Sequence, residues 1–235
     1  MGAALGAVRD ADVLLEELRC QGASLPKLDA PAAEALLARL SSERKAANER
    51  LLTILDSDRY LALLSDLTAA ANDPPLGGPA AEPEATARLI LPRLLARPAR
   101  RLRRGVRGLG DDPADESLHE VRKRAKDLRY TAEAAVPVHG TPARKLAAAA
   151  QELQEVLGGL HDAVVAEAWL RRSGTSGAPS QALVAGQLIE RERRRQAACR
   201  AAWPEVWRKT ATKRLRAWIG ADLPDPSHAK NYAPS

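Results

Sequence analysis

Residues 117–133 read SLHEVRKRAKDLRYTAE, and this stretch decides how the rest of the chain is interpreted. On a helix at about 100° per residue, one face is apolar and carries Leu118, Val121, Ala125, Leu128, Ala132 and Ala135. The opposite face carries His119, Arg122, Lys126, Arg129, Tyr130 and Glu133. Water-exposed helix faces usually interleave Glu and Lys four residues apart. A column of cations repels itself, so the pattern indicates a polyanion bound along it.

The composition favours an all-α protein. The 235 residues are sufficient for a sizeable core or for two small bundles. The chain has no Phe and only three Tyr, and its apolar residues are mainly Ala, Leu and Val. Such a set suits close helix packing and lacks the aromatic and β-branched mixture typical of strands. Because no segment alternates with a period of two, we expect no sheet.

The charge is unevenly distributed along the chain. The net charge is +6, from 36 Lys and Arg against 30 Asp and Glu. Residues 1–85 contain 8 basic and 14 acidic residues, whereas residues 86–235 contain 28 basic and 16 acidic ones. This asymmetry predicts an anion-binding part rather than a uniformly basic protein.

Targeting signals and cysteine spacing bear on the compartment. The N-terminus has no positive region followed by an apolar run, and no stretch approaches 18 apolar residues. We therefore expect neither secretion nor a membrane partner. Cys20 and Cys199 have no metal-binding or redox spacing, and we expect reduced thiols in the core of a cytosolic protein.

Capping and turn residues divide the chain into predicted helices. Pro92 and Pro98 argue for a kink or a break, and Pro204 suits the first turn of the final helix. Residues 72–83, NDPPLGGPAAEP, are the clearest linker, and the tail from residue 221 is expected to be disordered. The predicted helices span about 3–20, 32–55, 58–71, 84–106, 116–136, 143–172, 180–201 and 203–219.

An internal repeat relates the two halves. Residues 5–19 align with residues 157–171 at an offset of 152, with seven of 15 positions identical, and the similarity resumes at an offset of 147. We therefore predict a first repeat at 1–72, a linker at 73–83, a second repeat at 84–220 and a tail at 221–235. Two predicted helices precede LGGLHD in the second copy, whereas the first copy starts directly at LGAVRD. The first copy is thus expected to lack its opening helices, and self-association is expected if an apolar face is left uncovered.

These motifs resemble a known family. LHEVRKRAKDLRYTAE, residues 118–133, resembles the signature helix of CHAD domains, the conserved-histidine α-helical domains. LGGLHD at 157–162 and LGAVRD at 5–10 resemble the second CHAD motif, L-G-x-x-[HR]-D, and the likeness covers residues 3–219. The resemblance implies two pseudo-symmetric antiparallel helical bundles with a basic surface or pore between them. It also implies binding of inorganic polyphosphate without catalysis.

The candidate ligands of such an anion are cations. Polyphosphate carries about one charge per phosphate and no bases, so spaced cations suffice, and Arg can bind two oxygens at once. Arg122, Lys123, Lys126 and Arg129 are the first candidates, and the ordinary alternative is a solvated helix face. Arg93, Arg97, Arg100 and Arg104 share one helix sector. The further candidates are His119, Tyr130, Lys145, His161, Arg9, Arg191 and Arg195.

Three of these side chains have competing interpretations. His119 is either a charged donor to phosphate or a structural hydrogen-bonding residue at the start of its helix. Tyr130 either packs with its hydroxyl at the basic face or contacts phosphate directly. His161-Asp162 looks like a metal doublet, but Arg9 replaces the histidine in the other copy, and arginine is not a metal ligand. Anion contact by His161 therefore explains the exchange better, and no metal or cofactor is expected.

Three functional hypotheses follow. The first is a non-catalytic polyphosphate-binding adaptor in the cytosol, located on polyphosphate granules. The second is a nucleic-acid-binding protein, which the charge supports equally well but the few aromatic residues do not. The third is an enzyme of phosphate metabolism that uses His119 and His161, although no nucleophile–base pair or P-loop is evident.

Overall fold

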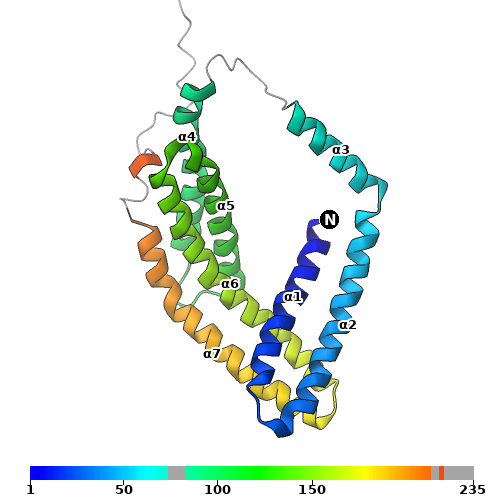
Figure 1. Ribbon diagram of the computed structural model, residues 1–235. Coiled ribbons are helices and arrows are strands. Elements are labelled where there is room, and N and C mark those ends of the chain that lie inside the picture. The colour runs from blue at the N-terminus through cyan, green and yellow to red at the C-terminus, as the bar shows by residue number, and fades with distance from the viewer. Residues whose placement is uncertain (74–82, 213–216, 220–235) are drawn as a thin grey trace, which may run out of the picture. The chain divides into compact units, whose positions relative to one another are not determined.

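The structure, a computed structural model, describes residues 1–73, 83–212 and 217–219, and this part of the chain consists of helices joined by short connections (Figure 1). Its secondary structure consists of seven α-helices and two short 3-10 helices, with no strand among the described residues. The all-α class predicted from composition and periodicity is therefore confirmed. In chain order the elements are α1 (Gly2–Ala23), η1 (Lys27–Asp29), α2 (Ala30–Leu55), α3 (Asp58–Asn72), α4 (Pro83–Arg107), α5 (Asp115–His139), α6 (Thr141–Thr175), α7 (Pro179–Thr210) and η2 (Ala217–Ile219).

The helix ends differ from the sequence expectation where prolines are involved. α4 continues through Pro92 and Pro98, α5 runs past Pro137, and α7 passes through Pro204 instead of starting anew there. A proline inside a helix costs about 3 kcal/mol. In α4 the wholly buried Leu95 and Leu102 offset that cost by packing. α5 ends at His139, and the φ of 59° at the following Gly140 needs a residue without Cβ.

The chain forms two compact units, each built from two separate segments. Unit 1 comprises Met1–Gly78 and Gly159–Ala198, and unit 2 comprises Pro79–Gly158 and Cys199–Ser235. Both α6 and α7 therefore contribute one part to each unit. The repeats at 1–72 and 84–220 were predicted from sequence similarity, whereas the two units reflect contacts in space, so the repeats stay a prediction. The predicted linker lies almost wholly, and the tail entirely, outside the described residues.

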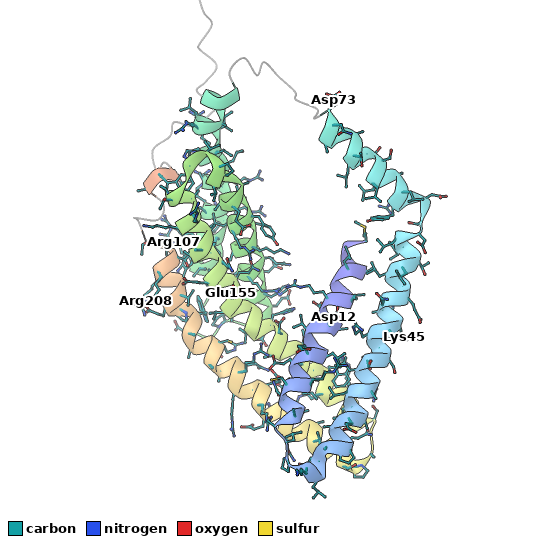
Figure 2. All side chains as sticks on the ribbon, viewed as in Figure 1. Asp12, Lys45, Asp73, Arg107, Glu155 and Arg208 are labelled. Carbon is teal, nitrogen blue, oxygen red and sulfur yellow. The ribbon has the colours of Figure 1, made fainter. Side chains whose placement is uncertain are left out.

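Unit 1 is built on a hairpin of α1 and α2 packed with the second part of α6 and the first part of α7. Its core is made of leucines and alanines with one valine and one tryptophan, and the central members are Leu14, Leu15, Leu18, Leu36, Leu40, Ala166, Trp169, Leu170, Val184, Ala185 and Leu188. The indole Nε1 of Trp169 donates a hydrogen bond to Glu43 at 2.8 Å. Asp12, labelled on α1 in Figure 2, pairs with Arg44 of α2. Cys20 is exposed and Cys199 is half-buried, so the expected place of Cys20 in the core is wrong, and neither cysteine is part of a disulfide.

A buried carboxyl group joins α7 to α1 inside unit 1. Glu192 is fully buried, and its Oε1 accepts a hydrogen bond from Nε2 of Gln21 at 2.5 Å. Its Oε2 lies 3.7 Å from Nη1 of Arg195, which also pairs with Glu17 at 3.1 Å. Burial raises the pKa of Glu192, because the charged form loses its hydration.

Unit 2 packs α4 and α5 with the first half of α6 and the end of α7 (Figure 1). Every apolar residue predicted for the inner face of α5 is buried, from Leu118 to Ala135. The buried residues of the helices that neighbour α5 are Leu95 and Leu102 on α4 and Ala143, Leu146, Ala150, Leu153 and Leu157 on α6.

The described helices include none that is long and apolar enough to cross a membrane.

Truncating a core side chain of α1 should destabilise the protein. Leu18 is only 1% exposed, so Leu18→Ala is expected to lower the free energy of unfolding by about 2–5 kcal/mol. Urea denaturation followed by circular dichroism measures this. Leu28 is 91% exposed, and Leu28→Ala should change stability by no more than about 0.5 kcal/mol. Equal losses for the two variants would contradict the packing described.

The buried Glu192 should make stability depend on pH. The folded protein holds this proton more tightly than the unfolded chain, whose pKa is about 4.5. Its contribution to stability is therefore full below that pKa and falls as the pH rises through the folded pKa. Glu192→Gln can still accept the hydrogen bond from Gln21 but does not ionise.

The stability of Glu192→Gln relative to wild type should therefore increase as the pH rises above about 4.5. Urea unfolding at several pH values measures the difference. Glu190→Gln, at an exposed position of the same helix, is the control and should show a smaller change. A difference that stays constant with pH for Glu192→Gln would rule out the raised pKa.

Candidate anion-binding surface

The α5 column, defined here as Arg122, Lys126 and Arg129, lies on a flank of α5 beside its buried face. Arg122 is half-buried, and its Nε has no hydrogen-bond partner within the described part of the chain. A Cβ built on Gly158 of α6 would lie 3.4 Å from that nitrogen. The guanidinium therefore lies against α6 at a glycine, and the two sequence motifs meet at this contact.

The other end of the column contacts α6 through a side chain. Arg129 donates from Nε to Glu133 at 2.7 Å and from Nη1 to Gln154 at 3.4 Å. The hydrogen bond to Glu133 raises the pKa of Arg129. The sequence had suggested a purely cationic column. The structure shows that one carboxylate, Glu133, already neutralises its last member, Arg129.

Lys123 also has a carboxylate partner. Its Nζ pairs with Glu120 one turn earlier, and that hydrogen bond lowers the pKa of Glu120. Two of the four cations first assigned to the anion are thus engaged with acids of their own helix. Arg122 and Lys126 have no carboxylate partner among the described side chains. They are the members of this group that retain the most uncompensated charge.

Tyr130 lies between two of the cations. Its ring centroid is 5.6 Å from Nζ of Lys126 and 5.4 Å from Cζ of Arg129, within the range of cation–π contacts. The side chain is 51% exposed, so Tyr130 packs on the cations and not in the core. His119, half-buried, lies about one turn before Arg122 on the same helix.

The α4 stripe is the second cationic surface of unit 2, and it consists of Arg93, Arg97, Arg100 and Arg104. All four are exposed and lie on the face of α4 opposite the buried Leu95 and Leu102. No described carboxylate forms an ion pair with any of them. Figure 2 labels Arg107 at the end of this helix. Lys145 is exposed on the second turn of α6.

Arg124 is a cation that the sequence interpretation missed. Its guanidinium lies so close to Gly105 of α4 that a Cβ there would overlap Nη1. The sequence signal that could have identified this contact is Gly105 itself, a glycine within an arginine-rich helix. α4 therefore contacts one flank of α5, while the α5 column lies on the opposite flank beside α6. The α4 stripe and the α5 column are distinct faces of the same unit.

The remaining predicted residues lie in unit 1. Arg9 is exposed on α1. His161 lines a small pocket that also contains Asp10 and Asp162, so the two copies of the second motif meet there, together with Glu17 and Arg195. The described residues contain no group of three or more His, Cys, Asp or Glu side chains able to hold a metal ion.

Arg191 and Arg195 hold α7 against α1. Nη1 of Arg191 donates to the backbone oxygen of Gln21 at 2.8 Å and to Oγ of Ser24 at 2.6 Å. Arg195 is paired with Glu17 and Glu192, as described above. Two carboxylates compensate the charge of Arg195, whereas the acceptors of Arg191 are uncharged and only fix its guanidinium in place.

Comparison with known proteins identifies a family. The family model "CHAD domain" matches residues 1–171. Two uncharacterized proteins of Mycobacterium tuberculosis, MT2285 of strain CDC 1551 / Oshkosh and Rv2226 of strain ATCC 25618 / H37Rv, are each 31% identical over 172 residues. These matches cover 68% of the present chain and 31% of each relative, so the chain spans about a third of their length. CHAD domains in general are known for association with polyphosphate.

Proposed function

Because the chain belongs to the CHAD domain family, we propose that it binds inorganic polyphosphate through the α5 column. The α4 stripe offers a second cationic surface along which a long anion can continue. The module binds polyphosphate without catalysis and acts as an adaptor on polyphosphate granules in the cytosol. The ligand class comes from the family, and the choice of helix comes from the geometry of unit 2.

The observation that carries this proposal is the state of Arg122. Its guanidinium is half-buried against Gly158, and no carboxylate neutralises it within the described residues. A partly desolvated cation without a partner is costly, whereas a phosphate oxygen both neutralises and hydrogen-bonds it. Lys126, on the next turn, lacks an acid partner as well, so an anion that follows the helix meets both in succession.

Polyphosphate suits this arrangement better than a nucleic acid. A chain of phosphates carries no bases, so it needs spaced cations and no stacking platform. Among the described residues, Tyr130 is the aromatic side chain that contacts the α5 column. Its ring makes cation–π contacts with Lys126 and Arg129. A competing nucleic acid would therefore gain phosphate contacts but no base stacking.

Removing the α5 column should abolish most of the affinity. The variant Arg122→Ala/Lys126→Ala/Arg129→Ala is expected to bind long-chain polyphosphate about 100-fold more weakly, from roughly 1 kcal/mol per lost contact. The slope of log affinity against log salt should fall by about 2, because three phosphate contacts are lost. Titration at two salt concentrations measures both quantities.

The matched control removes three cations that already have acid partners. Arg171, Arg194 and Arg208 are exposed and paired with Glu167, Glu190 and Glu205, so their triple alanine variant loses the same charge elsewhere. Its affinity should change by no more than about threefold. Equal weakening of both variants would show a non-specific charge effect. Displacement of bound polyphosphate by an equal charge of single-stranded DNA would favour the nucleic-acid hypothesis.

Freeing Arg129 should strengthen binding. An anion must compete with Glu133 for this guanidinium, and Glu133→Gln removes that competitor. An exposed ion pair contributes little, so the gain in polyphosphate affinity should be roughly two- to fivefold. Glu205→Gln, which frees Arg208 on α7, is the control and should leave affinity nearly unchanged. Unchanged or weaker binding by Glu133→Gln would exclude Arg129 from the site.

A further inference from the structure

The α4 stripe carries enough charge to hold an anion without help from the α5 column. Residues 88–107 contain eight arginines and no acid. Four of these recur every three or four residues along one exposed line, namely Arg93, Arg97, Arg100 and Arg104. At 1.5 Å per residue this line is about 16 Å long, against about 10 Å for the column. Each surface can therefore contact several phosphates in succession.

The two surfaces lie on different sides of unit 2. Arg124 lies against Gly105, which places α4 on one flank of α5 (Figure 1). Arg122 lies against Gly158, which places α6 and the column on the other flank. The stripe lies on the side of α4 opposite the buried Leu95, so it faces away from the core of the unit. A strand bound along one surface therefore does not lie along the other.

Acidic side chains separate the two surfaces on α5. At about 100° per residue, Glu116, Glu120 and Asp127 fall within about 40° of one another, on the exposed side between the column and the flank that contacts α4. Glu120 pairs with Lys123, but neither Glu116 nor Asp127 forms an ion pair with a described cation. An anion that crosses α5 from the column to the stripe therefore meets like charge.

The turn that joins α4 to α5 is acidic as well. Asp111 and Asp112 are exposed there, and Asp115 begins α5. Arg200 of α7 compensates part of this charge by pairing with Asp112 and Asp115. A path around this end of the two helices is therefore no better for an anion than the path across α5.

We propose that the column and the stripe hold two separate strands of polyphosphate at the same time, so that one protein molecule cross-links two chains. This inference rests on the proposed function for the column and adds the stripe as an independent site. A protein with two such sites gathers chains into a network, because a chain bound at one site holds the other site close to neighbouring chains. The activity that follows is condensation of polyphosphate, beyond attachment to it.

A sandwich assay on the full chain tests for two strands. Short polyphosphate chains are attached sparsely to a surface by one end. Each protein is loaded until equal amounts are retained, and soluble fluorescent polyphosphate is then added. The fluorescence captured per retained protein molecule reports the second strand.

Three matched variants remove three arginines or lysines each. The column variant is Arg122→Ala/Lys126→Ala/Arg129→Ala, and the stripe variant is Arg97→Ala/Arg100→Ala/Arg104→Ala. The control is the triple alanine variant of Arg171, Arg194 and Arg208, which are exposed and paired with acids. None of the substituted residues is buried, so all variants should keep the helical circular dichroism of the wild type.

The wild type and the control should capture the fluorescent chain. Each surface variant should be retained yet capture at least about tenfold less, because only one site remains. A stripe variant that captures like the wild type, as two associated copies would, overturns the proposal. A wild type that is retained but captures nothing overturns it too, and the proposed function survives both results.

Other outcomes bear on the column itself. A column variant that captures like the wild type, or a wild type that is not retained at all, overturns the proposed function together with this inference. A column variant that is not retained at any loading shows that the stripe binds no strand, which overturns the cross-linking alone.

Discussion

The arrangement of unit 2 depends on the small residues that line the buried face of α5. Ala125, Ala132 and Ala135 are completely buried, and they allow neighbouring helix backbones to approach closely. Glycines on both neighbours extend this closeness: Gly105 of α4 receives Arg124, and Gly158 of α6 receives Arg122. Long cationic side chains thus lie against helix backbones on both flanks of α5. A bulkier seam would separate the helices and leave these arginines free to point into solvent.

The fold class and the inner face of α5 could be predicted because both follow from local periodicity. Leu118 to Ala135 recur at 3.6-residue spacing, and that period alone identifies the buried side. The continuation of α4 and α7 through their prolines could not be predicted. The cost of Pro92, Pro98 or Pro204 inside a helix is local, whereas the packing that offsets this cost comes from residues distant in sequence. Nothing near residue 204 in the sequence shows that α7 continues to Thr210.

The candidate site was predicted in outline but not in its pairings. Arg129 and Glu133 are four residues apart in the sequence, a spacing that allows an ion pair but does not require one among so many cations. Arg191 and Arg195 looked like surface cations, and their partners Gln21 and Glu17 lie at least 170 residues earlier in the chain. Arg124 was overlooked because its significance comes from Gly105, on another helix. In each case the missing information was a contact between elements that are distant in sequence.

Lysine acetylation in the presence and absence of long-chain polyphosphate, read by mass spectrometry, tests the location of the ligand most directly. The chain offers Lys126 on the α5 column and, in unit 1, the exposed Lys27 and Lys45 for comparison. If polyphosphate lies along α5, saturation with it should slow acetylation of Lys126 severalfold and leave Lys27 and Lys45 unchanged. Equal protection of all three lysines, or protection of Lys27 and Lys45 without Lys126, would contradict the assignment of the anion to α5.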